Sequence, residues 1–178
     1  MIALFKMLLY TTGKIRFALL TILLLTIFST KGAARPDTSS NTVSYFLLKD
    51  ENGKTINLTD LKGKVVFLNF WALSCIPCKK EMPTITRLQQ HFKTDTNIMI
   101  LPVDLDNTLL KSTKYMRDNG FGLSVYSVAS VVPAKLFHGE LPTTVVIDKN
   151  GMIVLFKEGE DDYGSKKFFD YMEGLIKK

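Results

Sequence analysis

An uninterrupted apolar run followed directly by a helix-like segment constrains the fold of this chain most strongly. Residues 65–70 read VVFLNF, as expected for a strand buried on both faces of a mostly parallel sheet. The next segment repeats apolar side chains at helical spacing, at Met82, Ile85, Leu88 and Phe92. A buried strand that leads into an amphipathic helix predicts the β-α unit of an α/β domain.

The remaining elements extend this unit on both sides. Two Asn-Gly dipeptides between apolar stretches predict β-hairpins. The predicted strands are 44–49, 54–58, 97–104, 123–127, 143–148 and 152–157, and the predicted helices are 108–119, 165–177 and a helical turn near 131–137. Pro102 indicates that its strand lies at an edge, is bulged or ends early. This order predicts an α/β sandwich, a mixed central β-sheet with helices on both faces and an N-terminal β-hairpin.

The start of the chain predicts export from the cytoplasm. Lys14 and Arg16 precede the apolar run 17–28, and small residues allow cleavage after Ala34, which is typical of a signal peptide. An uncleaved membrane tether through residues 17–30 is the alternative. Both interpretations place the domain outside the cytoplasm, either periplasmic or membrane-anchored and facing the periplasm.

Charge and composition define the parts of the chain. Four of the 23 basic side chains and none of the 17 acidic ones lie within residues 1–34, which leaves 19 basic and 17 acidic side chains beyond them. The folded part is therefore nearly neutral, and we predict no nucleic-acid partner. We divide the chain into a signal peptide or N-terminal membrane anchor at 1–34, a polar linker at 35–42 and a domain at 43–178.

The only two cysteines stand together in Cys75-Ile76-Pro77-Cys78. A small disulfide scaffold would contain more cysteines at longer spacings. At a strand-to-helix junction the helix N-terminus lowers the pKa of the first thiol, so Cys75 would attack a substrate disulfide. Cys78, one turn later, would resolve the mixed disulfide. Pro77 lies in the first turn, where a missing amide hydrogen costs nothing.

Metal binding is the main alternative use of these cysteines. A zinc site would need a second ligand pair, and His91 and His138 lack the required spacing. An exported copper-binding chaperone would use Cys75 and Cys78 as soft ligands, with His138 or a methionine as a third. We predict redox chemistry, with no metal and no dissociable cofactor, because the electrons reside in the cysteine pair.

A longer stretch around the cysteines resembles a known family. Residues 69–83 read NFWALSCIPCKKEMP and residues 58–64 read LTDLKGK, which is similar to the active-site segment of TlpA/ResA-type thiol–disulfide oxidoreductases of the thioredoxin superfamily. The resemblance covers roughly residues 43–177. It implies a thioredoxin fold, an extracytoplasmic enzyme, disulfide-containing protein substrates and a membrane electron donor.

The resemblance also assigns roles to single residues. Glu81, three residues after Cys78, matches a carboxylate thought to manage protons near the cysteines, although beside two lysines it otherwise reads as a solvated charge. Leu141 and Pro142 resemble the cis-proline loop, whose backbone pairs with a substrate chain like an added strand; without the resemblance Pro142 reads as an ordinary trans-proline. The residues expected to face the substrate are Trp71, Ile76, Pro77, Leu141 and Pro142.

Two departures from the family limit what the resemblance implies. Ser74 replaces the aromatic residue that most relatives have before the nucleophile, and residues 137–141 (FHGEL) replace a glycine-rich segment of haem-maturation members. The family's substrate preference and its haem-maturation role are therefore not carried over. We predict a protein-disulfide reductase recharged by a membrane donor; a disulfide-forming oxidant of the same fold is an alternative. A peroxiredoxin would have a Thr-x-x-Cys nucleophile without a vicinal partner.

Overall fold

The computed structural model describes residues 41–43 and 45–178. The predicted signal peptide or anchor at 1–34, and most of the predicted linker at 35–42, lie outside the described residues. Residues 41–178 form one unit, and its first residues already pair with the domain, because Thr42 bridges Met152. Within the described ranges we find no helix long and apolar enough to cross a membrane.

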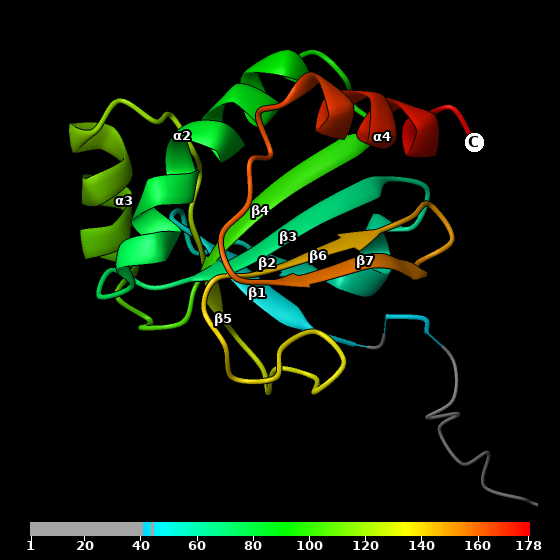
Figure 1. Ribbon diagram of the computed structural model, residues 1–178. Helices are drawn as coiled ribbons and strands as arrows, with labels where there is room; N and C mark the ends of the chain where they lie inside the picture. Colours follow the sequence, from blue (N-terminus) through cyan, green and yellow to red (C-terminus); the bar gives the residue numbers. More distant parts are fainter. Residues whose placement is uncertain (1–40, 44) are drawn as a thin grey trace, which may run out of the picture. The chain divides into compact units, whose positions relative to one another are not determined.

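A seven-stranded mixed sheet forms the centre of the unit, in the order β2-β1-β5-β4-β3-β6-β7 (Figure 1). The strands are β1 Leu47–Asp50, β2 Thr55–Asn57, β3 Val65–Trp71, β4 Ile98–Asp104, β5 Tyr126–Val128, β6 Thr143–Ile147 and β7 Ile153–Glu158. β3 pairs in parallel with β4 and antiparallel with β6. Every residue of β3 is buried, as the apolar run at its start predicts.

Helices cover the sheet, and they are η1 Leu58–Leu61, α2 Ile76–His91, α3 Leu109–Asp118 and α4 Lys166–Ile176. Figure 1 shows α2 and α4 on the same side of the sheet, where Phe67, Met82 and Met172 share one core cluster. The opposite face packs against η1 and the β5–β6 connection, with Phe70 and Leu136 in a second cluster. Helices on both faces and the N-terminal hairpin β1–β2 are therefore confirmed, with a single short 3-10 helix on the second face.

The segment between α3 and β6 differs from its prediction. The strand occupies Tyr126–Val128 rather than 123–127. Leu123 and Val125 are buried in the core but lie ahead of the strand, so their alternating apolar pattern resembles a strand that starts three residues early. The predicted helical turn near 131–137 is a turn closed by the Leu136 amide donating to the Pro133 carbonyl at 2.9 Å.

Pro102 lies inside β4, which continues to Asp104. β4 is an internal strand, so the expectations of an early end or a true edge position are wrong. β5 pairs with β4 only at Val103 and Asp104, whereas Pro102 faces Asn69 of β3. Up to Pro102 the strand therefore has a ladder partner on one side only, and a missing amide hydrogen is tolerated there.

Candidate active site

Cys75 and Cys78 are joined by a disulfide at the junction of β3 and α2. Cys75 is the N-cap residue of α2, and the Cys78 amide donates to its Sγ at 3.2 Å. Cys75 is half-buried, whereas Cys78 has no exposed surface. A helix N-terminus and an amide donor both stabilise a thiolate at Cys75. The geometry therefore offers one reachable sulfur and one shielded sulfur, as the predicted division between nucleophile and resolver requires.

Pro77 and Ile76 occupy the first turn of α2. Pro77 sits among the first four helical positions, where an amide has no intrahelical partner in any case. The Ile76 side chain is 66% exposed, which leaves an apolar surface directly beside Cys75. Its exposure is compatible with the prediction that Ile76 faces a substrate.

Trp71 does not face a substrate in this form of the protein, and that prediction is corrected. Its side chain is fully buried and packs against Tyr115, with ring centroids 6.0 Å apart. Its indole Nε1 is buried without a hydrogen-bond partner. Trp71 closes the end of β3 beneath the disulfide, because a large apolar ring gains more from burial there than from exposure.

A buried aspartate secures the loop before Cys75, a contact that the sequence analysis missed. The Leu73 amide donates to Asp106 Oδ2 at 3.1 Å, and the Asp106 amide donates to Asp104 Oδ1 at 2.9 Å. Asp104 is fully buried and also accepts from the Thr108 amide and the Ser112 hydroxyl, at 2.9 and 2.7 Å. The β4–α3 loop thereby fixes the loop that carries Cys75.

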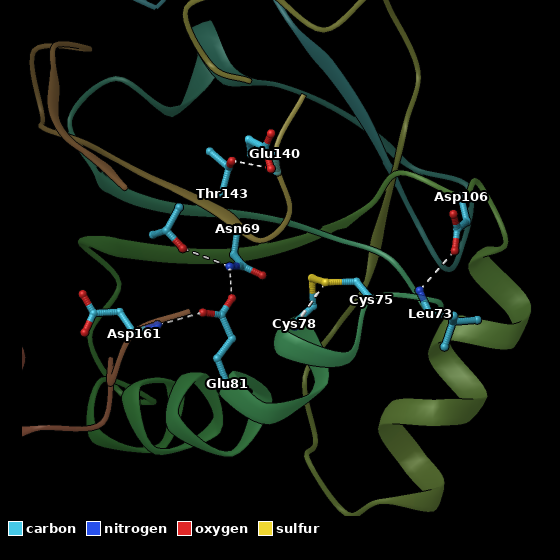
Figure 2. Close-up of a disulfide and its surroundings, with 10 residues drawn as sticks. Asn69, Leu73, Cys75, Cys78, Glu81, Asp106, Glu140, Thr143 and Asp161 are labelled. Carbon is cyan, nitrogen blue, oxygen red and sulfur yellow. Dashed lines mark hydrogen bonds between the residues drawn. A yellow bond between two sulfur atoms is a disulfide. The ribbon is translucent and has the colours of Figure 1, made fainter. Parts of the chain in front are cut away.

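Glu81 is almost completely buried, with 2% of its surface exposed. Figure 2 shows its carboxyl directed from α2 toward Asn69, with Cys78 one turn nearer the start of the helix. Asn69 Nδ2 donates to Oε1 at 2.7 Å, and the Asp161 amide approaches Oε2 at 3.4 Å. Burial raises the pKa of Glu81 from 4.5 to about 7, although both hydrogen bonds act in the opposite direction. The expectation that Glu81 is a solvated charge is therefore wrong.

The loop of Leu141 and Pro142 lies at the same end of the sheet as Cys75. The Leu141–Pro142 peptide bond is cis, as the resemblance implies. The Thr143 hydroxyl donates to the Glu140 carbonyl at 2.6 Å, and the Gly159 amide donates to the Pro142 carbonyl at 2.9 Å. β6 starts directly afterwards and runs antiparallel to β3, which brings its first residues to the cysteine end.

The two histidines have partners of their own. His91 stacks on Phe169 at a centroid distance of 4.2 Å, and His138 Nδ1 lies 3.4 Å from Glu158 Oε1. Among residues 41–43 and 45–178 we find no group of three or more His, Cys, Asp or Glu side chains that could hold a metal ion.

Known proteins resemble this chain over most of its length. The model of the AhpC/TSA family matches residues 40–156. Thiol-disulfide oxidoreductase ResA of Bacillus thuringiensis (strain Al Hakam) is 37% identical over 137 residues, which cover 75% of this chain and 73% of that protein. The chain belongs to the ResA-like thiol–disulfide oxidoreductases. ResA of Bacillus subtilis (strain 168) is 36% identical and covers 74% of this chain and 72% of its own length.

Solved structures show the same fold at lower identity. A thiol:disulfide interchange protein from Chlorobium tepidum TLS is 24% identical, has a TM-score of 0.60, and covers 79% of this chain and 99% of its own. StoA from Bacillus subtilis is 23% identical with a TM-score of 0.57, and covers 73% of this chain and 95% of its own. The chain is thus a thiol–disulfide oxidoreductase with a thioredoxin-like fold.

Proposed function

We propose that this chain is an extracytoplasmic enzyme that reduces disulfides in protein substrates through Cys75 and Cys78. The observation that carries the proposal is the combination of a reachable sulfur at the start of α2, a shielded sulfur one turn later and a buried carboxyl one turn after that. This combination of side chains does not favour copper binding or peroxide reduction in the same way.

The reaction balances two electrons and two protons. The Cys75 thiolate attacks one sulfur of a substrate disulfide, forms a mixed disulfide and releases the other sulfur, which takes up a proton. Cys78 then attacks the Cys75 sulfur, forms the Cys75–Cys78 disulfide and releases the second substrate thiol. A membrane thiol donor would restore the reduced pair by the same exchange.

Glu81 would receive the proton that Cys78 loses. The second step needs a Cys78 thiolate, and Cys78 is fully buried, where burial disfavours the charged sulfur. A carboxyl one turn away with a pKa of about 7 is suited to accept that proton near neutral pH. The environment of Glu81 therefore favours attack by Cys78, the step that completes reduction.

Leu141 would bind the substrate backbone. No backbone hydrogen bond joins Leu141 to another described residue outside the regular strands and helices. Its amide and carbonyl are therefore open to an extended substrate segment that adds as a strand. Pro77, Ile76 and Pro142 would complete the contact surface.

The location outside the cytoplasm rests on the sequence of residues 1–34 and on the resemblance to ResA. A basic start followed by an apolar run is the pattern of exported proteins. A vicinal cysteine pair in an oxidising compartment needs a source of electrons, which is why we include a membrane donor.

The decisive test is the reduction potential of the Cys75–Cys78 pair against glutathione. The reduction potential is about −270 mV for thioredoxin and about −120 mV for a strong oxidant of the same fold. We expect a value on the reductant side, together with reduction of insulin disulfides by the reduced protein. Cys78→Ala should trap substrates on Cys75 as mixed disulfides, whereas Cys75→Ser should trap none.

Each alternative has its own signature in the same preparation. A potential near that of the strong oxidants would replace the reductase with a disulfide-forming enzyme. Stoichiometric copper retained through dialysis under reducing conditions would support the chaperone. Rapid turnover of hydrogen peroxide would support a peroxidase, and we expect this turnover to be slow.

A further inference from the structure

A cavity of about 330 Å³ opens beside Glu81, on the side of α2 that faces the connection between β7 and α4. Its wall consists of Lys80, Glu81, Thr84, Glu160, Asp161 and Asp162. Neither cysteine, nor Leu141, nor Pro142 belongs to this wall. The cavity therefore reaches the buried carboxyl from a side other than the one where a substrate would cover the disulfide.

The two oxygens of Glu81 have unequal surroundings. Both hydrogens of the Asn69 amide are engaged, one with Glu81 Oε1 at 2.7 Å and one with Thr144 Oγ1 at 2.9 Å. An oxygen that accepts a short N–H bond cannot carry a proton along that direction without breaking the bond. Asn69 therefore keeps Oε1 as an acceptor whether the carboxyl is charged or neutral.

Oε2 is the freer oxygen. Its described partner is the Asp161 amide at 3.4 Å, longer than the usual range of N–H···O bonds. Figure 2 shows Glu81 between Asn69 on one side and Asp161 on the other. Because Asp161 also forms part of the cavity wall, Oε2 is the oxygen on the cavity side.

We propose that Glu81 gains and loses its proton at Oε2, through the cavity between α2 and residues 160–162, while Asn69 acts as a positioning residue that holds Oε1. The inference rests on the proposed role of Glu81 in disulfide reduction. It implies that the proton taken from Cys78 leaves to solvent while the substrate still covers the cysteines.

The charges around the carboxyl support a route of this kind. Glu160 and Asp161 both raise the pKa of Glu81 by their negative charge, and such charges also favour the presence of protons at the cavity mouth. Asp162 is paired with Arg87 at 3.0 Å, and Asp161 lies 4.0 Å from Lys157. Lys80 also lines the cavity, and the charge of Glu81 acts on the buried Tyr163 phenol; the cysteines add titratable groups only when the disulfide is reduced.

The test follows the carboxyl carbon of Glu81 by ¹³C NMR in the full chain in mild detergent, with Glu81→Gln assigning the signal. It measures protonation directly and needs no turnover, so its failure is distinct from loss of reductase activity. In the Cys78→Ala variant, with a short cysteine-containing peptide joined to Cys75 by a disulfide, we expect one Glu81 signal whose position still moves with pH. A single signal means that the protonated and charged forms of Glu81 exchange rapidly. The double variant Glu160→Gln/Asp161→Asn should lower the pKa of Glu81, whereas Asp162→Asn should change this pKa less.

Blocking the cavity supplies the matched comparison. Lys80→Trp and Thr84→Trp place a bulky ring on the wall, and we expect the Glu81 signal to broaden or divide near its titration midpoint in each. Lys79→Trp, next to Lys80 but not on the wall, should leave the signal averaged. Slow exchange caused by the peptide on Cys75, or no effect from either wall variant, would overturn the proposal.

Discussion

Replacing Glu81 with glutamine should make the protein's stability less dependent on pH. Burial raises the pKa of Glu81 from 4.5 to about 7, so the folded protein holds this proton more tightly than the unfolded chain does. That contribution to stability is fully present below about pH 4.5 and is lost as the pH rises through about 7. Glutamine has nearly the same shape and never ionises, so Glu81→Gln avoids the loss.

The size of the effect follows from the same two values. The difference between 4.5 and about 7 corresponds to about 3 kcal/mol in the free energy of unfolding. Urea unfolding of both oxidised proteins, followed by the fluorescence of the single tryptophan, Trp71, gives this energy at each pH. As the pH rises from 4.5 to 8, we expect the free energy of unfolding of Glu81→Gln to increase by about 3 kcal/mol relative to that of the parent protein.

An exposed glutamate provides the control. His91 and Lys177 lower the pKa of Glu173, so its contribution to stability is present above about pH 4.5 and is lost as the pH falls through the lower folded value. The free energy of unfolding of Glu173→Gln should therefore differ from that of the parent protein most at neutral pH and least in acid. A stability difference between Glu81→Gln and the parent that stays constant from pH 4.5 to 8 would refute the argument that Glu81 is buried with a raised pKa.

Four further substitutions test the surroundings of the disulfide and the core side of α2. Asp104→Ala leaves several loop donors unpaired and should lower the free energy of unfolding by about 3 kcal/mol. Asp106→Ala removes only the bond to Leu73 and should lower it by about 1 kcal/mol. Urea titration measures both losses, and equal losses would contradict the larger role of Asp104. Leu88→Ala, on the core-facing side of α2, should lower the free energy of unfolding by about 2–5 kcal/mol in the same titration. Asn69→Leu removes the main donor to Glu81 and should raise the pKa of Glu81 further, seen by ¹³C NMR; a lowered pKa would exclude Asn69 as a donor.

The sheet and the main helices could be predicted because their signals are local. The run 65–70 gave the buried strand, and the spacing of Met82, Ile85 and Leu88 gave α2, since these residues face one core cluster. The segment around β5 could not be placed as well. Leu123 and Val125 are buried without belonging to the strand, and burial alone carries no information about ladder pairing.

The role of Glu81 was predicted only through the resemblance, because its neighbours in sequence are lysines and suggest a solvated charge. Its position, three residues after Cys78 and four before Ile85, lies on the buried face of α2, so helical periodicity contained the correct signal. A charged residue at a core position is unusual unless it is paired or functional. Helical spacing therefore indicates the burial of Glu81 better than the charge of its neighbours in sequence does.

Long-range contacts at the site left no pattern in the sequence. Leu73 and Asp106 are 33 residues apart, and Glu81 and Asp161 are 80 residues apart. Neither pair is joined by a motif, because each depends on how the loops at one end of the sheet converge after folding. The cysteine pair could be recognised from its spacing and Glu81 from the resemblance, whereas the contacts that Asp106 and Asp161 make with the site could not be predicted.

The pairing of Thr42 with Met152 has a practical consequence for handling the protein. Met152 belongs to the turn between β6 and β7, at the end of the sheet opposite Cys75. The chain therefore enters the domain at the end away from the disulfide. A purification tag, a fluorophore or a chip surface joined ahead of residue 41 meets the domain at that end, and an immobilised sample should keep its disulfide open to a large client protein.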